Sequence, residues 1–345
     1  TAGGCETAVH ATRRYLETMP PDWVLVKLDL SNAFNSLHRS DMLLAIRDRL
    51  PELYAYCFSA YAEPSVLFHG PFTISSEEGP QQGDPIGPLL FSNCIHPMLK
   101  SMESMLTSGC LDDVTLGGPV DIVARDVTKI VEIGGKMGLN LNCSKCELVT
   151  HDNFTVSDAR LQSFSSVSVN DVSLLGAPLF PGSVLTAEWS QRCADLSRAV
   201  ERLNSIGSQD ALILLRASFG APKVQHLLRC SPSYQHPALQ TFDDLLKEAV
   251  QQTTNSNLSV TQWVQASLPI KDGGLGIRRV SSLALPAFLA SAASTLSLQN
   301  HILADCLVSE DSHMRNYSET WSMEFGSPSY PLPSKQSSWD RPRVL

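Results

Sequence analysis

The chain has 345 residues, 43% of them hydrophobic and 18% charged, and its formal net charge is −9. This length and apolar content are enough for a buried core in two or more domains, and the acidic balance argues against binding nucleic acid through overall basicity. No uninterrupted apolar run approaches the ~20 residues that span a bilayer, and the first residues lack the pattern of a signal peptide, so we expect an intracellular protein with no membrane partner.

The nine cysteines are scattered along the chain. This distribution favours a reducing compartment over a disulfide framework. Only Cys143 and Cys146 have the spacing of a metal-binding pair, and no second such pair accompanies them. We therefore do not expect a zinc site.

The first part of the chain predicts a helix, a strand and a second helix. Glu6–Met19 has a helical pattern that two prolines close, and the valine- and leucine-rich run Asp22–Leu30 indicates a buried strand. Residues 39–50 have helical spacing, with Ser40 as the expected N-cap and Pro51 beyond the end.

Mixed helices and strands continue to about residue 179. Five further elements are expected: a hairpin at 65–84 that turns at Gly70-Pro71, a long helix at 88–106, a hairpin that contains Asp112 and Asp113, a helix at 120–138 and a strand at 173–179. From Thr186 onward the pattern is almost wholly helical. Residues 190–280 form the one segment with a positive balance, and residues 326–345 are rich in proline and serine. We predict an α+β fold followed by a helical domain and a flexible tail.

Two adjacent carboxylates, Asp112 and Asp113, interrupt a short apolar run. Taken alone, the pair is most simply the polar tip of a hairpin, because aspartate is favoured in tight turns. The alternative is a divalent-cation site, since a cation removes the repulsion between two ionised carboxylates. Asp29, at the end of the predicted strand and on the same face as Lys27, has two similar interpretations: a turn or helix cap, or a carboxylate that faces a cleft.

Six short motifs decide between these interpretations by their order. They are "VKLDLSNAFNSL", "GPQQGDPIGPLLFS", "CLDDV", "GLNLNCSKCEL", "LLGAPL", and "LPIKDGGLGIRR" with "ALPAFLAS". In this order they resemble the reverse transcriptase domain of non-LTR (LINE-like) retrotransposons, over roughly residues 1–295.

The resemblance implies an architecture and an activity. The architecture is a right-hand polymerase palm, an antiparallel sheet with helices on one face, at 1–184 with a remnant of the fingers, then a helical thumb or connection at 185–300 and a Pro/Ser-rich tail at 301–345. The activity is that of an RNA-directed DNA polymerase, a nucleotidyltransferase that extends a DNA primer on an RNA template with deoxynucleoside triphosphates. Two Mg²⁺ ions, for which Mn²⁺ can substitute, and residence in the nucleus are also implied.

The resemblance also implies roles for single residues. Asp29 and Asp112 would bridge the two cations with Asp113 as support, and Lys145 would neutralise or protonate the leaving pyrophosphate. The predicted nucleotide contacts are Ala33, Phe34, Gln82 and Gly83, and the predicted primer and duplex contacts are Leu175, Gly176, Arg192, Arg198 and Arg202. Phe34 would exclude a 2′-hydroxyl. The simpler alternatives are an ordinary core side chain for Phe34, plain turn residues for Gln82 and Gly83, a surface lysine for Lys145 and a solvated helix face for the arginines.

Three departures from the family pattern bear on activity. Cys110 and Leu111 stand where an aromatic and a small residue are usual, and "DPIGP" follows the Gln-Gly pair where Ser-Pro is more common. The chain begins just before the first catalytic motif, so we expect a truncated protein whose upstream fingers and endonuclease segments are missing partners. The alternative function is a catalytically inactive relic, or a repurposed module that binds RNA or protein.

Overall fold

The computed structural model describes residues 3–152, 154–304, 306, 311–326 and 335–344. The chain forms two compact units. The sheet unit comprises Met19–Val169 with Ile302–Leu307, and the helical unit comprises Thr1–Thr18, Asn170–His301 and Val308–Leu345. These units differ from the predicted division at residue 184, because the opening helix and residues 170–184 pack with the helical unit.

A five-stranded sheet forms the centre of the sheet unit. Its order is β4-β5-β1-β6-β7, and every neighbouring pair is antiparallel except β6 with β7. The strands are β1 (Trp23–Leu28), β4 (Leu106–Cys110), β5 (Asp113–Pro119), β6 (Glu147–Thr150) and β7 (Ser165–Ser168). The position of β1 in the middle of the sheet explains its nearly continuous apolar sequence.

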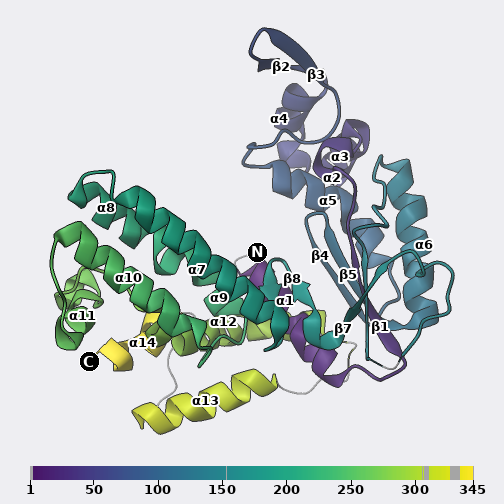
Figure 1. Cartoon of the computed structure of the whole chain (residues 1–345). Coiled ribbons are helices and arrows are strands. Elements are labelled where there is room, and N and C mark those ends of the chain that lie inside the picture. Colours follow the sequence, from purple (N-terminus) through teal and green to yellow (C-terminus); the bar gives the residue numbers. More distant parts are fainter. Residues whose placement is uncertain (1–2, 153, 305, 307–310, 327–334, 345) are drawn as a thin grey trace. The chain divides into compact units, whose positions relative to one another are not determined.

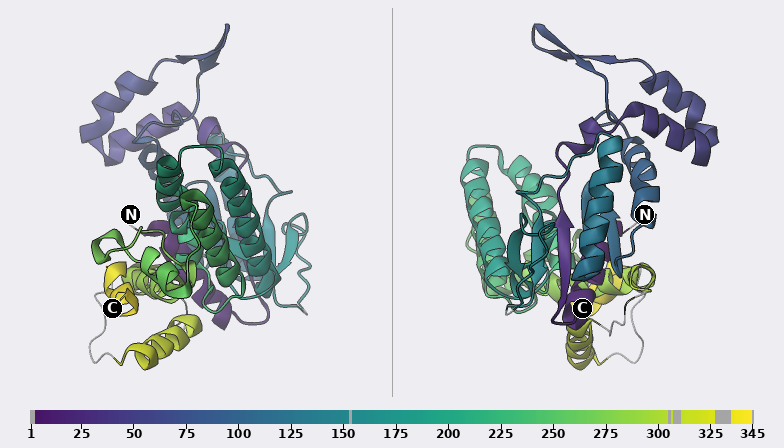
Figure 2. Two further views of the ribbon diagram at one scale, coloured as in Figure 1. Left: turned by 60° about the vertical axis from the view of Figure 1, so that its left-hand side comes forward. Right: turned by 90° about the vertical axis from the view of Figure 1, so that its right-hand side faces the viewer.

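Two helices pack against one face of this sheet, as the right-hand view of Figure 2 shows. They are α5 (Gly87–Lys100) and α6 (Val120–Lys136), and their apolar sides share a core with Val24, Val26 and Leu28 of β1. The antiparallel-rich sheet with helices on one face confirms the predicted α+β class. Helix α5 ends at Lys100 rather than at residue 106, because Leu106 already belongs to β4.

A helical and hairpin insertion follows β1 (Figure 1). It contains α2 (Ala33–Ser36), α3 (Arg39–Arg49), α4 (Pro51–Tyr61), β2 (Ser65–His69) and β3 (Phe72–Ser76). The N-cap of α3 is His38, not the predicted Ser40. Pro51 starts α4 instead of ending the region, since proline is well accommodated in the first helical turn.

The helical unit is built almost entirely from helices. These are α1 (Gly4–Thr18), α7 (Ser183–Leu203), α8 (Ser208–Leu214), the π-helical turn η2 (Leu215–Phe219), α9 (Ala221–Cys230), α10 (Ala238–Thr254), α11 (Val260–Ala266), α12 (Val280–Ile302), α13 (Ser312–Phe325) and α14 (Gln336–Val344). A small hairpin, β8 (Ser173–Leu174) with β9 (Ala177–Pro178), precedes α7. By length and composition α12 could cross a membrane, but 67% of its most apolar window is buried, as in the core helix of a soluble protein.

Helices α1, α13 and α14 are tied into this unit by specific contacts. Arg13 of α1 forms a 2.8 Å ion pair with Asp311, and both side chains are buried. Trp321 of α13 donates a hydrogen bond to the backbone oxygen of Trp339 in α14, and the two rings meet edge to face at 5.4 Å. Part of the predicted flexible tail is therefore packed, because its tryptophans supply apolar surface that the proline and serine content obscures.

Candidate active site

The candidate site begins where β1 ends. Val26 and Leu28 of β1 point into the core shared with α5 and α6. Alternate strand residues lie on opposite faces, so Lys27 and Asp29 lie on the other side. Both are only partly buried, and Lys27 forms a 2.7 Å ion pair with Glu147 of β6. Asp29 is therefore a partly buried carboxylate on the face of the sheet opposite to α5 and α6.

The β4–β5 hairpin brings the two other carboxylates to the same strand end. Cys110 pairs with Asp113, so the turn consists of Leu111 and Asp112, with Leu111 at a φ of 58°. On the other side of β5, Leu28 pairs with Val114. Continuing this antiparallel register by one residue places Asp29 opposite Asp113, with Asp112 in the adjacent turn.

Electrostatic coupling agrees with this register. Partial desolvation raises the pKa of Asp113, the charge of Asp112 raises it further, and the charge of Asp29 adds a smaller effect in the same direction. Lys27 acts in the opposite direction and lowers the pKa. The three carboxylates are thus close enough to repel one another, and at least one of them responds by holding its proton more tightly.

The donor set fits a hard divalent cation. Mg²⁺ prefers a few carboxylate oxygens together with substrate phosphates, and it would offset the repulsion that raises the pKa of Asp113. Within the described part of the chain, no three side chains of His, Cys, Asp or Glu converge into a ready metal-binding group. The strand register thus brings the backbones of Asp29, Asp112 and Asp113 to one strand end, and their carboxylates are not arranged as a ready metal site in the structure.

Residues 140–146 hold the backbone of Asp29 from both sides. The N–H of Asp29 donates to the sulfur of Cys146 at 3.4 Å, and the N–H of Asn142 donates to the carbonyl of Asp29 at 2.8 Å. Lys145 lies in the same turn and is exposed. Lys145 thus lies in the segment that is bonded to Asp29. This position fits both the predicted contact with pyrophosphate and the simpler alternative of a surface lysine.

Phe34 lies in α2, directly after Asp29. Its ring stacks on that of Phe91 with centroids 5.5 Å apart, and its tip lies 3.2 Å from the Cβ that a side chain at Gly87 would carry. The Phe34 side chain is thus partly buried against the core, which leaves both predicted roles open. Ala33 is 1% exposed in the same core, and its nucleotide contact remains a prediction.

Gln82 and Gly83 are both exposed in the turn that precedes α5. Gly83 has a φ of +95°, in the region where glycine carries no steric cost, and an added Cβ would meet nothing within 4 Å. The turn therefore needs glycine for its backbone conformation. The neighbouring Gln81, rather than Gln82, donates a side-chain hydrogen bond, to Ser65 at 2.8 Å.

A buried polar cluster fixes this turn, and the sequence patterns did not identify it. The hydroxyl of Tyr61 donates to the carboxylate of Asp84, and the guanidinium of Arg39 lies 5.3 Å from the Tyr61 ring centroid. Arg39 also donates to the carbonyl of Gly79 at 3.1 Å. Desolvation and the bond to Asp84 raise the pKa of Tyr61 to about 12, so the phenol keeps its proton. The only signal for this cluster in the sequence was an arginine in α3 and a tyrosine in α4, two helices whose apolar residues do not gather clearly on one face.

The predicted primer and duplex residues all belong to the helical unit. Leu175 and Gly176 form the turn of the β8–β9 hairpin, both with positive φ, and the carbonyl of Leu175 lies 3.0 Å from Nε2 of His226. Arg192, Arg198 and Arg202 are on α7. Arg198 and Arg202 line one groove, whereas Arg192 pairs with Glu188 on its own helix and does not line it.

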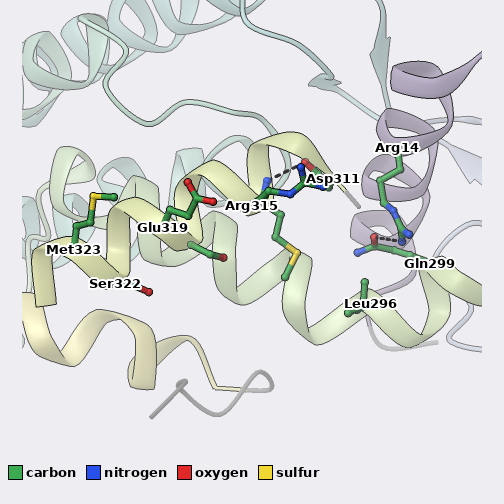
Figure 3. A pocket seen from close by; sticks show the side chains of 10 residues that line it. Arg14, Leu296, Gln299, Asp311, Arg315, Glu319, Ser322 and Met323 are labelled. Carbon is green, nitrogen blue, oxygen red and sulfur yellow. Dashed lines mark hydrogen bonds between the residues drawn. The ribbon is translucent and has the colours of Figure 1, made fainter. Parts of the chain in front are cut away.

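A cavity of about 700 Å³ in the helical unit involves none of the predicted site residues. Figure 3 shows it between the ends of α1 and α12 and the length of α13, with Arg14 hydrogen-bonded to Gln299 at 3.1 Å. Its buried carboxylate, Asp311, is already paired with Arg13. The volume is therefore large, but Asp311 and Arg14 already bond to side chains of other helices.

Comparison with known proteins identifies the family of the first half of the chain. Residues 3–179, just over half of the chain, match the family described as "Reverse transcriptase (RNA-dependent DNA polymerase)". The chain is 24% identical over 332 residues to the "Retrovirus-related Pol polyprotein from type-2 retrotransposable element R2DM" of Drosophila melanogaster. This alignment covers 84% of this chain and 31% of that protein. It is also 24% identical over 297 residues to the "Retrotransposable element SLACS 132 kDa protein" of Trypanosoma brucei gambiense, covering 82% of this chain and 24% of that protein.

The chain spans a third or less of the length of these two relatives. Among solved structures, telomerase from Candida albicans in complex with the TWJ fragment of telomeric RNA resembles it with a TM-score of 0.39 and 10% identity, over 98% of this chain and 52% of that one.

Proposed function

We propose, from the premise that the chain belongs to the reverse transcriptase (RNA-dependent DNA polymerase) family, that it extends a DNA primer on an RNA template with deoxynucleoside triphosphates. The observation that supports the proposal is the pairing of Leu28 with Val114 and of Cys110 with Asp113, a register that, extended by one residue, would bring Asp29 opposite Asp113 with Asp112 in the adjacent turn. The reaction joins the primer 3′-oxygen to the α-phosphorus of the nucleotide and releases pyrophosphate.

Asp29, Asp112 and Asp113 would hold two Mg²⁺ ions. When bound, the ions supply charge stabilisation to the attacking and leaving oxygens. Asp113 has a raised pKa in the folded chain, so cation binding there competes with its protonation as the pH falls. Lys145, in the turn bonded to Asp29, would place a cation beside the leaving pyrophosphate.

Phe34, Gln82 and Gly83 would shape the nucleotide site. The exposed part of the Phe34 ring would lie against the sugar, where its bulk disfavours a 2′-hydroxyl. The open space at Gly83 allows a nucleotide or template base to approach the backbone closely. In the helical unit, the Leu175–Gly176 turn would contact the primer through its backbone, and Arg192 and Arg198 of α7 would contact duplex phosphates.

Primer extension on an RNA template tests the proposal. Asp29→Asn and Asp112→Asn should each lower kcat by at least about a hundredfold, as expected when charge stabilisation at the reacting phosphate is lost. Asp121→Asn is the matched control, since Asp121 is an exposed carboxylate of the same unit at the start of α6. Equal activity of wild type and Asp29→Asn would refute the assignment.

Mn²⁺ binding, measured by electron paramagnetic resonance, provides a second readout. Wild type and Asp121→Asn should bind Mn²⁺, and Asp29→Asn should bind it more weakly. If no variant, wild type included, binds Mn²⁺ or extends a primer, the chain is a catalytically inactive member of the family.

A further inference from the structure

A groove of about 400 Å³ lies in the helical unit between α7, α8, η2 and the start of α9. We call it the α7–α9 groove. Cationic side chains, Arg198, Arg202 and Lys223, and apolar side chains, Leu203, Leu214 and Phe219, line it. Helices α7 and α8 can be followed in Figure 1. Its size is within the range of pockets that hold a small organic ligand.

The groove carries an excess of positive charge. Arg198 is paired with Asp195 on its own helix, and Asp195 is the one carboxylate among the residues that line the groove. Arg202 and Lys223 are exposed, and neither forms an ion pair within the described residues. Two cations are thus available to a ligand that carries negative charge.

Part of the groove lining consists of exposed apolar side chains. An ordinary solvated helix face would carry polar side chains at such positions. Leu214 is 36% exposed and Ile206 is 43% exposed, and both line the groove. Leu203, also in the lining, is buried. An anion such as free phosphate would need the cations but not this apolar surface, so the groove suits a ligand with a charged part and a flat apolar part.

A π-helical turn creates this arrangement. The N–H of Gly220 donates to the carbonyl of Leu215 at 2.8 Å, five residues earlier. In a regular α-helix, residues five apart lie about 140° apart around the axis, and the wider turn brings Leu214 and Phe219 onto one side. An added Cβ at Gly220 would lie 2.7 Å from the Leu215 carbonyl, so the turn depends on glycine.

We propose that the α7–α9 groove binds an unpaired stretch of the RNA template, with a base against Leu214 and Phe219 and adjacent phosphates on Arg202 and Lys223. The inference rests on the proposed function for the identity of the strand. Single-stranded nucleic acid is bound by the combination of a cationic groove and a stacking surface. Bases in a duplex are stacked on their neighbours and present only phosphates to such a groove.

Fluorescence anisotropy of a short labelled oligouridylate, which forms no stable duplex, tests the proposal. Arg202→Ala/Lys223→Ala should weaken binding about tenfold and reduce the salt slope by about 1.4, since each phosphate contact on a single strand contributes about 0.7. Phe219→Leu, which keeps apolar bulk but removes the ring, should weaken binding severalfold with the salt slope unchanged. Lys247→Ala/Lys271→Ala, two lysines of the same unit outside the groove, should bind as wild type does.

A blunt RNA–DNA duplex of the same length separates the alternatives. The proposal is overturned if the groove variants lose duplex binding as much as single-strand binding, if they bind oligouridylate as wild type does, or if wild type does not bind it. Displacement of oligouridylate by polyglutamate as efficiently as by unlabelled RNA would instead identify an acidic polypeptide site. Primer extension by the same proteins reports the proposed function separately, because loss of RNA binding in the groove variants can be seen whether or not wild type polymerises.

Discussion

The backbone N–H of Asp29 donates a hydrogen bond to the thiol sulfur of Cys146 across 3.4 Å, although 117 residues separate the two in sequence. Cys146 is fully buried, and burial raises the pKa of its thiol to about 11. The sulfur therefore remains a neutral acceptor at physiological pH. Together with the bond from Asn142, it fixes the peptide groups on both sides of the candidate catalytic carboxylate.

Cys146→Ala should destabilise the fold and misplace Asp29. The substitution leaves a partly buried N–H without its acceptor, which costs at most about 1–3 kcal/mol. Cys146→Ser retains an acceptor and should recover most of the loss. Chemical denaturation gives the stability, and the Mg²⁺ concentration for half-maximal primer extension reports the position of Asp29. A Cys146→Ala variant with an unchanged Mg²⁺ requirement would limit Cys146 to a packing role.

Asp113→Asn should stabilise the chain at neutral pH while lowering activity. The folded-state pKa of Asp113 is raised, so its contribution to stability is present below the unfolded pKa and is lost as pH rises through the folded pKa. Asparagine carries no charge, so the substitution removes the destabilising effect of the ionised carboxylate at neutral pH. The gain in stability should be less than about 1 kcal/mol, because the side chain is exposed to solvent that screens the charge. Thermal denaturation at neutral and acidic pH measures this. The gain should vanish at acidic pH, and a variant less stable than wild type at neutral pH would contradict the expectation.

Tyr61→Phe should loosen the turn that carries Gln82 and Gly83. It removes the hydroxyl that donates to Asp84, at a cost of about 1–3 kcal/mol for a hydrogen bond to a charged group. We expect KM for the deoxynucleotide to rise more than kcat falls, because the candidate catalytic carboxylates lie elsewhere in the unit. Tyr56→Phe is the control, since Tyr56 lies on the same helix α4 and is 62% exposed. Equal effects of the two substitutions would argue against a role for the cluster.

Phe34→Val should relax discrimination against ribonucleotides if the ring lies against the sugar. The stacking on Phe91 is also lost, so stability should fall by about 1–2 kcal/mol in either case. Phe91→Leu disturbs the same stack from the buried side. Steady-state incorporation of matched deoxy- and ribonucleotides separates the two roles. A change in sugar preference confined to Phe34→Val supports the nucleotide contact, and none in either variant makes Phe34 a core residue.

Asp311→Asn should destabilise the helical unit by about 3–5 kcal/mol, because it leaves the buried Arg13 guanidinium without its counter-charge. Although burial opposes ionisation, Arg13 holds the pKa of Asp311 down at about 2. Its folded pKa lies below the unfolded value, so the stability it contributes is present above about pH 4 and is lost as pH falls toward 2. Denaturant titration across this range tests the sign. Asp272→Asn, at an exposed carboxylate, should leave stability within about 0.5 kcal/mol.

Local patterns anticipated most of the secondary structure and the family. The apolar strand before Asp29, the helix of α6 and the hairpin at Gly70-Pro71 are present, because each depends on the spacing of nearby residues. The reverse transcriptase family inferred from the order of the motifs is confirmed by the match to residues 3–179. The roles predicted for single site residues remain predictions.

Other features depend on contacts between distant segments. The sequence alone placed α1 with the palm, but Arg13 pairs with Asp311 across 298 residues and ties it to the helical unit. The Arg39–Tyr61–Asp84 cluster was not foreseen for the same reason.

The sequence by itself therefore determined that Asp29 lies at the end of a buried strand and that Asp112 and Asp113 lie at a hairpin turn, since both are local properties of the chain. Only the tertiary structure decided that β1 pairs with β5 in a register that, extended by one residue, places Asp29 opposite Asp113, and that Cys146 binds the backbone of Asp29. Strand order and register follow from which apolar faces pack together, and a pattern within one segment carries no information about its partner.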